Sequence, residues 1–158
     1  MASVLIRSTA LAILMGLSLS VAAFDASSNR PVNLNDKGLV LDGYDPVSYF
    51  SGRPVQGNKD YSVSFEGGTY YFASKENMAK FKANASQFAP KFGGFCAMGV
   101  AKSKKLDSDP MAWRIVDGYL FVLQNKEVQK SWLVDVSSNL KVATGEWATI
   151  KNIAPKGL

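Results

Sequence analysis

The sequence predicts an α+β fold in which two β-hairpins form a small antiparallel sheet with short helices packed against it. The first hairpin turns at residues 67–68. In the second, the β-rich runs 113–116 and 119–123 flank Asp117-Gly118, which favours a type I′ turn because both central residues need positive φ. A capping residue and a helix-forming stretch follow each hairpin. Hairpins followed by helices are typical of α+β domains.

A short helix and the two strands of the first hairpin are expected in residues 43–72. Asp45 is placed to cap a short helix over residues 43–50, and Pro46 would take its first position, where a missing N–H costs nothing. Residues 61–65 alternate apolar and polar side chains, which is the period of a strand. Residues 69–72 then complete the first hairpin.

The helices of the sequence are expected to begin at small polar residues. Ser74 is the expected N-cap of the first helix. The apolar stretch after Ser74 is expected to be divided into two short helices at Pro90. Asn125 is the expected N-cap after the second hairpin. Ser137 or Ser138 is expected to cap the last helix.

Residues 1–23 have the layout of a secretory signal peptide. Arg7 precedes an apolar run over residues 9–23 that ends in small residues, and this run is short for a membrane span. We expect cleavage after Ala23 and export, to the periplasm of a Gram-negative cell or otherwise by secretion.

The remainder is expected to form one domain with polar extensions. Residues 24–37 are rich in Ser, Asn and Asp and predict a flexible tether. The domain is expected at residues 38–150, followed by a C-terminal tail at 151–158. The sequence gives no sign of an internal repeat, and no second stretch approaches membrane-spanning length.

Composition excludes several classes of chemistry. The 158 residues include no histidine. This excludes imidazole-dependent hydrolysis and histidine-ligated zinc or haem sites. The one cysteine, Cys96, leaves no intramolecular disulfide to form. The net charge is +5, or +4 after Arg7 is removed with the signal peptide, and the basic residues are scattered. This pattern does not indicate nucleic-acid binding.

Several short motifs in the first half of the domain belong together. They are Asp45-Pro46-Val47, Tyr70-Tyr71-Phe72-Ala73-Ser74, Phe81 and Phe88. Together they resemble the YHS domain family, and the resemblance covers roughly residues 43–90. It extends further, over residues 93–99 and 113–132, to a stand-alone exported branch of that family. It implies a treble-clef-like metal-binding fold associated with copper and other heavy metals.

The sequence departs from the family at its metal ligands. The resemblance places the three family cysteines at Ser48, Ala73 and Asn77, none of which supplies a thiolate. A thiolate site needs several such ligands converging on one ion. The resemblance therefore implies the fold without the family's metal site.

Cys96 is the main candidate for chemistry, and two hypotheses need no metal. A lone cysteine is most often a small buried hydrophobic residue. Alternatively, a short helix beginning near Phe95 would lower the pKa of the thiol and make it reactive or redox-sensitive. Lys102 would help only if the fold brought it close.

A third hypothesis is a soft-metal site. Cys96 and Met98 form a Cys-x-Met pair, and thiolate with thioether is the ligand combination that selects Cu(I). Met78 or Met111 could add a further thioether. Copper is thus the metal that this pair would bind.

The other polar candidates have ordinary structural interpretations. Four loop carboxylates are expected to cap helices and form turns. Three lysines downstream of Cys96 are expected to lie in a solvated loop. The carboxylates are Asp42, Asp45, Asp107 and Asp109, and the lysines are Lys102, Lys104 and Lys105.

The sequence thus favours an exported, non-catalytic binding module with weak copper binding through Cys96 and Met98. A metal-handling or other exported partner protein, or a second copy of the chain, could complete the site. The alternatives are a thiol-based redox or reactive-cysteine protein that uses Cys96, and a purely structural or interaction domain.

Overall fold

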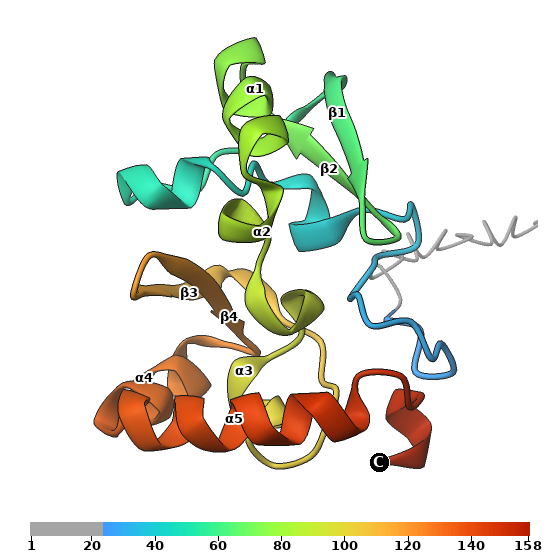
Figure 1. Cartoon of the computed structure of the whole chain (residues 1–158), viewed down its shortest axis with the longest axis vertical. Helices are drawn as coiled ribbons and strands as arrows, with labels where there is room; N and C mark the ends of the chain where they lie inside the picture. The colour runs from blue at the N-terminus through green and yellow to red at the C-terminus, as the bar shows by residue number, and fades with distance from the viewer. Residues whose placement is uncertain (1–23) are drawn as a thin grey trace, which may run out of the picture.

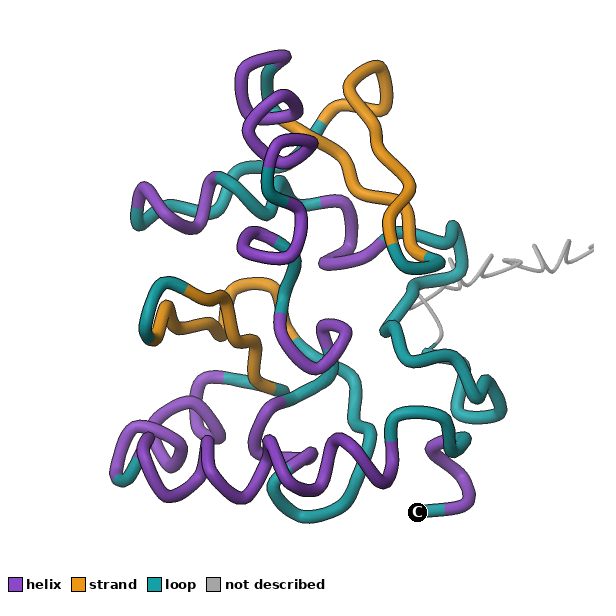
Figure 2. Tube along the Cα trace, in the orientation of Figure 1, coloured by secondary structure: helices purple, strands orange, loops and turns teal. Residues whose placement is uncertain are grey.

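A computed structural model describes residues 24–158, so the expected signal peptide at 1–23 lies outside the described residues. Two antiparallel hairpins with short helices packed around them confirm the α+β class. The hairpins form two separate two-stranded sheets, which corrects the expectation of a single sheet. Figure 1 and Figure 2 show the first hairpin and its helices in the upper half and the second set in the lower half.

The two halves pass through similar series of elements. The first contains η1 (Val40–Gly43), η2 (Ser48–Ser51), β1 (Asn58–Phe65), β2 (Gly68–Phe72), α1 (Lys75–Ala83) and α2 (Ala85–Phe88). The second contains η3 (Lys91–Gly94), α3 (Ala97–Val100), β3 (Asp109–Val116), β4 (Tyr119–Leu123), α4 (Lys126–Val134) and α5 (Val136–Ile150). A short η4 (Pro155–Gly157) ends the chain.

The halves are an internal structural repeat with a constant offset of 51 residues. Corresponding strands pair in the same register, with Val63 opposite Tyr70 in the first hairpin and Arg114 opposite Phe121 in the second. Among the described residues, every residue with positive φ except Gly38 belongs to a pair at this offset. These pairs are Leu41 and Phe92, Asp42 and Gly93, Gly43 and Gly94, Gly52 and Ser103, Glu66 and Asp117, and Gly67 and Gly118.

We call residues 40–88 the first repeat and residues 91–150 the second repeat. The expectation that the chain contains no repeat is therefore wrong. Residue identity hides the repeat, because few equivalent positions carry the same residue. The repeats also differ in length at their ends. Helix α2 stops before Pro90, where a proline ring cannot continue the helix, whereas α5 meets no proline and runs on to Ile150.

The two hairpins differ in burial, and this explains why their sequences differ. Strand β4 contributes alternate side chains to two core clusters, so both of its faces are covered and it is apolar throughout. The outward face of the first hairpin is covered by no further repeat and carries polar residues instead. Its Ser62, Ser64, Thr69 and Tyr71 stand where the second hairpin has Trp113, Ile115, Leu120 and Val122.

Each repeat has its own core cluster, built around an equivalent aromatic residue. Phe81 of α1 lies in the first cluster and Trp132 of α4 in the second, and both are fully buried. Tyr70 and Phe121 are a second equivalent pair, one in each cluster. The repeats therefore bury the same positions with different side chains.

The predicted caps of two helices are confirmed, and a third is corrected. Ser74 accepts a hydrogen bond from the N–H of Asn77 at 3.1 Å, and Asn125 caps α4 in the same way. The last helix begins earlier than expected. Asp135 is its N-cap and accepts from the N–H of Ser138 at 3.0 Å, so neither Ser137 nor Ser138 is the cap.

The start of one expected helix and the position of one expected turn are shifted. The short helix after Asp45 is the 3-10 helix η2, and it begins at Ser48 rather than at Pro46. The first hairpin turns at Glu66-Gly67, and Gly68 already belongs to β2. A Cβ on Gly68 would lie 2.4 Å from Val40, so glycine is needed here for close packing rather than for the turn.

Residues 24–37, expected as a flexible tether, pack against the domain. Val32 is buried in the first cluster, and the N–H of Asn33 donates to the Gly93 carbonyl at 2.9 Å. A Cβ on Gly93 would lie 1.9 Å from the carbonyl oxygen of Pro31, so only glycine permits this approach. The side chains of Asn33 and Asn35 add hydrogen bonds from this segment to the domain.

Lys105 joins this segment to the C-terminal tail. Its ammonium is buried and donates to the carbonyls of Arg30 at 2.8 Å, Lys151 at 3.0 Å and Ile153 at 2.8 Å. It also lies 4.9 Å from the centre of the Phe95 ring. The expectation of a solvated loop is therefore wrong for Lys105. Among residues 24–158, no helix has the length and apolar character needed to cross a membrane.

Candidate functional site

Asp45 is a fully buried carboxylate whose two oxygens both accept hydrogen bonds. One oxygen accepts from the N–H of Val47 at 2.8 Å. The other accepts from the N–H of Ala73 at 2.9 Å and from the side-chain amide of Asn77 at 2.7 Å. Bonds from N–H groups to a carboxylate are among the stronger hydrogen bonds in proteins. Asp45 thereby ties the segment before η2 to the end of β2 and to α1.

Ser48 extends this network on the other side of Asp45. Its hydroxyl donates to the Asp45 carbonyl at 2.6 Å and accepts from the N–H of Val55 at 2.9 Å. Both Asp45 and Ser48 are buried, and a buried polar group is tolerated only when it is hydrogen-bonded. We call Asp45, Ser48, Ala73 and Asn77 the Asp45 network.

Cys96 lies between η3 and α3, at the N-cap of α3. Its sulfur accepts from the N–H of Gly99 at 3.4 Å, and its own N–H donates to the Leu106 carbonyl at 3.0 Å. The side chain is 1% exposed and belongs to the second core cluster. The short helix expected near Phe95 therefore exists, with the thiol at its start.

Burial reverses the expected effect on the Cys96 thiol. Loss of hydration raises its pKa above the ordinary value and outweighs the opposing effect of nearby backbone amides, while Lys102 contributes least. The expectation that the helix start would lower the pKa of this thiol is therefore wrong. A buried thiol with a raised pKa is protonated at neutral pH and reacts slowly.

The methionines lie in different surroundings. Met98 is partly buried against the same cluster as Cys96. Met78 packs against the first cluster, and Met111 is 43% exposed on β3. Within the part of the chain that the structure describes, no group of three or more Cys, Asp or Glu side chains is arranged to hold a metal ion.

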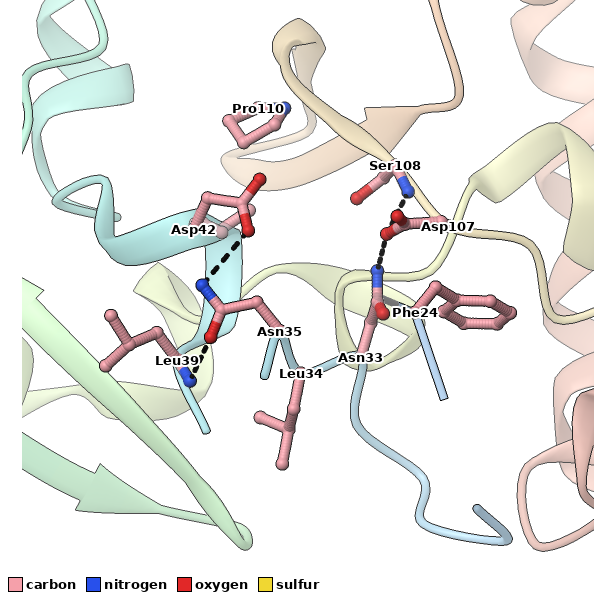
Figure 3. Close-up of a pocket in the computed structure, with 10 residues that line it drawn as sticks. Phe24, Asn33, Leu34, Asn35, Leu39, Asp42, Asp107, Ser108 and Pro110 are labelled. Carbon is pink, nitrogen blue, oxygen red and sulfur yellow. Dashed lines mark hydrogen bonds between the residues drawn. The ribbon is translucent and has the colours of Figure 1, made fainter. Parts of the chain in front are cut away.

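A cavity of about 260 Å³ lies where the N-terminal segment passes between the repeats (Figure 3). Two carboxylates on its wall are held by asparagine amides. Asn35 donates to Asp42 at 3.2 Å, and Asn33 donates to Asp107 at 2.8 Å. Burial and neighbouring carboxylates raise the pKa of Asp42. These contacts agree with the structural role expected for the loop carboxylates.

Comparison with known protein families finds a match for the first repeat. The model of the YHS domain matches residues 46–91. Residues 46–91 are a YHS domain. The match begins one residue after Asp45 and contains Ser48, Ala73 and Asn77. No curated protein and no solved structure matches the chain.

The three positions that the family resemblance assigns to cysteines all hydrogen-bond to one residue, Asp45. Ala73 and Asn77 donate to its carboxylate, and Ser48 donates to its backbone carbonyl. The sequence identified these positions as departures from the family but predicted only a helix cap for Asp45. Convergence from three separate elements could not be inferred from the pattern of the sequence alone.

The second repeat lies almost entirely outside the YHS match, yet it places Cys96 where Asp45 lies relative to the first repeat. The two residues are 51 positions apart. Asp45 accepts from the amides of Val47 and Ala73, and the equivalent amides, those of Met98 and Gln124, lower the pKa of Cys96. The thiol therefore occupies the position of the carboxylate as a weaker hydrogen-bond acceptor.

This position makes the reactivity of Cys96 testable. We expect a small thiol reagent to modify the native protein about 100-fold more slowly than the denatured protein, because the thiol is buried and protonated. Stopped-flow or absorbance kinetics with and without denaturant measure the ratio. Equal rates in both states would show an accessible thiolate and would support the reactive-cysteine hypothesis instead.

Proposed function

We propose that this chain is an exported, non-catalytic binding module in which the Asp45 network replaces metal ligation as the support of the YHS domain. The observation that carries the proposal is the convergence of Ser48, Ala73 and Asn77 on one buried residue, Asp45. Ala73 and Asn77 donate to its carboxylate, and Ser48 donates to its backbone carbonyl. A metal site and a hydrogen-bonded carboxylate can both join the same three elements. The network supplies this link from the chain's own residues.

The chemistry of the remaining groups supports a non-catalytic role. The sequence contains no histidine, and the Cys96 thiol is buried with a raised pKa. Because Cys96 occupies the position equivalent to Asp45, a structural role accounts for this residue without any reaction of its thiol. Export is supported by the pattern of residues 1–23, and the partner that we propose is another exported protein or a small ligand.

Weak copper binding by Cys96 and Met98 is the second candidate function. It is favoured by one observation, that Cys96 belongs to the second core cluster and Met98 packs against the same cluster. Ionisation of the thiol is opposed by burial, so copper would have to displace the contact with Gly99. This requirement predicts an affinity well below that of an open thiolate site.

Native mass spectrometry of the exported protein tests both candidates. We expect the mass of a chain that begins at Phe24 with no metal bound, and a thermal midpoint that EDTA leaves unchanged within about 1 °C. The measurement follows from the proposal because bound metal that stabilises the folded state raises its melting temperature. A stoichiometric metal removed by EDTA together with a fall in the midpoint would contradict the proposal.

Titration with Cu(I) against a competing chelator separates the two candidates. The non-catalytic, metal-free proposal expects Cys96→Ser and Met98→Leu to leave the copper affinity unchanged. If copper binds and both variants weaken it by tenfold or more, the copper function replaces the first proposal.

A further inference from the structure

A groove of about 650 Å³ lies at the junction of the two repeats, beside the turn of the first hairpin and the C-terminal end of α5. Figure 1 shows these two segments on the same side of the molecule. We call it the junction groove. Its volume falls in the range typical of small-molecule sites. Its lining includes Phe65, Glu66, Tyr70, Lys91, Phe92, Trp147 and Lys151.

Tyr70 carries a hydroxyl that packing does not require. The side chain is 2% exposed, and its hydroxyl makes no hydrogen bond to residues 24–158. The hydroxyl is not fully buried, since Nε1 of Trp132 is the one fully buried side-chain N or O atom without a partner in the described residues. The equivalent residue in the second repeat is Phe121, which is 4% exposed and fills its cluster without a hydroxyl. By contrast, the buried Tyr49 hydroxyl donates to the Pro110 carbonyl at 3.0 Å. A hydroxyl that lines a groove without a protein partner is free to bond to a ligand there.

The hydroxyl of Tyr70 is a hydrogen-bond donor that stays protonated. Burial raises its pKa, and the carboxylate of Glu66 raises it further. The second effect also places Glu66 near Tyr70, on the hairpin turn that borders the groove. The hydroxyl can therefore donate to an anionic ligand group at any physiological pH.

The charges around the junction groove are mainly positive. Lys91 and Lys151 line it, and Glu66 is the one acidic residue in its lining. The Lys91 ammonium is already engaged, lying 3.9 Å from the centre of the Tyr119 ring. Lys151 is exposed, and its ammonium makes no hydrogen bond or ion pair within the described residues. Lys151 is thus the cation available to a ligand.

We propose that the junction groove binds a small organic anion with an aromatic or other apolar body. Phe65, Phe92 and Trp147 offer apolar surface to the body of the ligand. The Lys151 ammonium and the Tyr70 hydroxyl supply the charge and the donor for its acidic group. This inference rests on the proposed binding-module function and names the ligand class for it.

Titration with 8-anilinonaphthalene-1-sulfonate tests the proposal, because this probe is an aromatic anion whose fluorescence rises at an apolar site. We expect saturable binding to the native protein. Lys151→Glu should weaken it about five- to tenfold by reversing the charge. Tyr70→Phe should weaken it about threefold by removing one hydrogen bond. Phe121 occupies the equivalent position, so Tyr70→Phe should keep the fold.

Lys141→Glu is the matched control. Lys141 lies on α5, the helix that Lys151 follows as C-cap, and it lines a separate shallow groove beside Val116 and Leu140. The same change of charge there should alter the affinity less than twofold. Chemical shift changes on the indole N–H of Trp147 should locate the probe.

Three results would overturn the proposal: no saturable binding, equal weakening by Lys141→Glu, or an unchanged affinity in Tyr70→Phe. Any of these would leave the metal measurements of the exported protein untouched, so the ligand class and the binding-module function fail separately.

Discussion

Replacing Asp45 with alanine is expected to lower the free energy of unfolding by about 3–5 kcal/mol. The substitution leaves the buried N–H of Val47, the part-buried N–H of Ala73 and the part-buried amide of Asn77 without their acceptor. Each unsatisfied buried donor costs about 1–3 kcal/mol. The loss also separates the segment before η2 from β2 and α1. Denaturant titration followed by circular dichroism measures the change.

Two further variants keep this prediction falsifiable. Asp60→Ala removes an exposed aspartate of β1, and we expect it to change the unfolding free energy by less than about 0.5 kcal/mol. Asp45→Asn keeps the volume but turns an N–H group toward the donors of Ala73 and Asn77. It should therefore destabilise almost as strongly as alanine. A loss below about 1 kcal/mol in both Asp45 variants would contradict the structural role of the network.

Lys105→Met is expected to destabilise the protein by about 2–4 kcal/mol and to release both ends of the described chain. Three carbonyls, those of Arg30, Lys151 and Ile153, would lose their shared donor. Methionine keeps most of the side-chain volume, so the effect reports the ammonium rather than a cavity. Hydrogen exchange should increase in residues 24–31 and 151–158 and much less in the two hairpins.

Lys102→Met is the control for this change. Lys102 is exposed on the same loop and makes no hydrogen bond through its ammonium within the described residues, so its replacement should leave exchange and stability nearly unchanged. If Lys105→Met raised exchange uniformly, or left the two terminal segments protected, then Lys105 would not be the residue that joins them.

Local sequence signals predicted the elements of this fold well. Asp117-Gly118 forms the hairpin turn, and both residues have the positive φ that the turn requires. Ser74 and Asn125 cap their helices as expected. These features depend on a few neighbouring residues, and a short window of sequence contains the relevant information.

Features that depend on distant residues could not be predicted in the same way. The partners of Lys105 lie 75, 46 and 48 positions away in the chain, and a lysine in a lysine-rich loop is ordinarily solvated. The repeat was hidden for a related reason. Equivalent positions face water in the first hairpin and the first core cluster in the second hairpin, so selection for burial gave them different residues.

The candidate site was predicted in part. The sequence identified Cys96, Met98 and the three replaced cysteine positions, but it gave no indication that Asp45 joins those positions. It placed the thiol correctly at a helix start, yet the sign of the pKa change depended on burial, which depends on the whole fold.

The position of β4 between the two core clusters has a consequence for folding. Leu120 and Val122 cover the cluster of the YHS domain, while Phe121 and Leu123 belong to the other. A fragment limited to residues 46–91 would therefore expose the apolar surface that β4 covers and would not be expected to fold alone. Because one strand completes both clusters, neither can melt without the other, and the two repeats should unfold in a single cooperative transition.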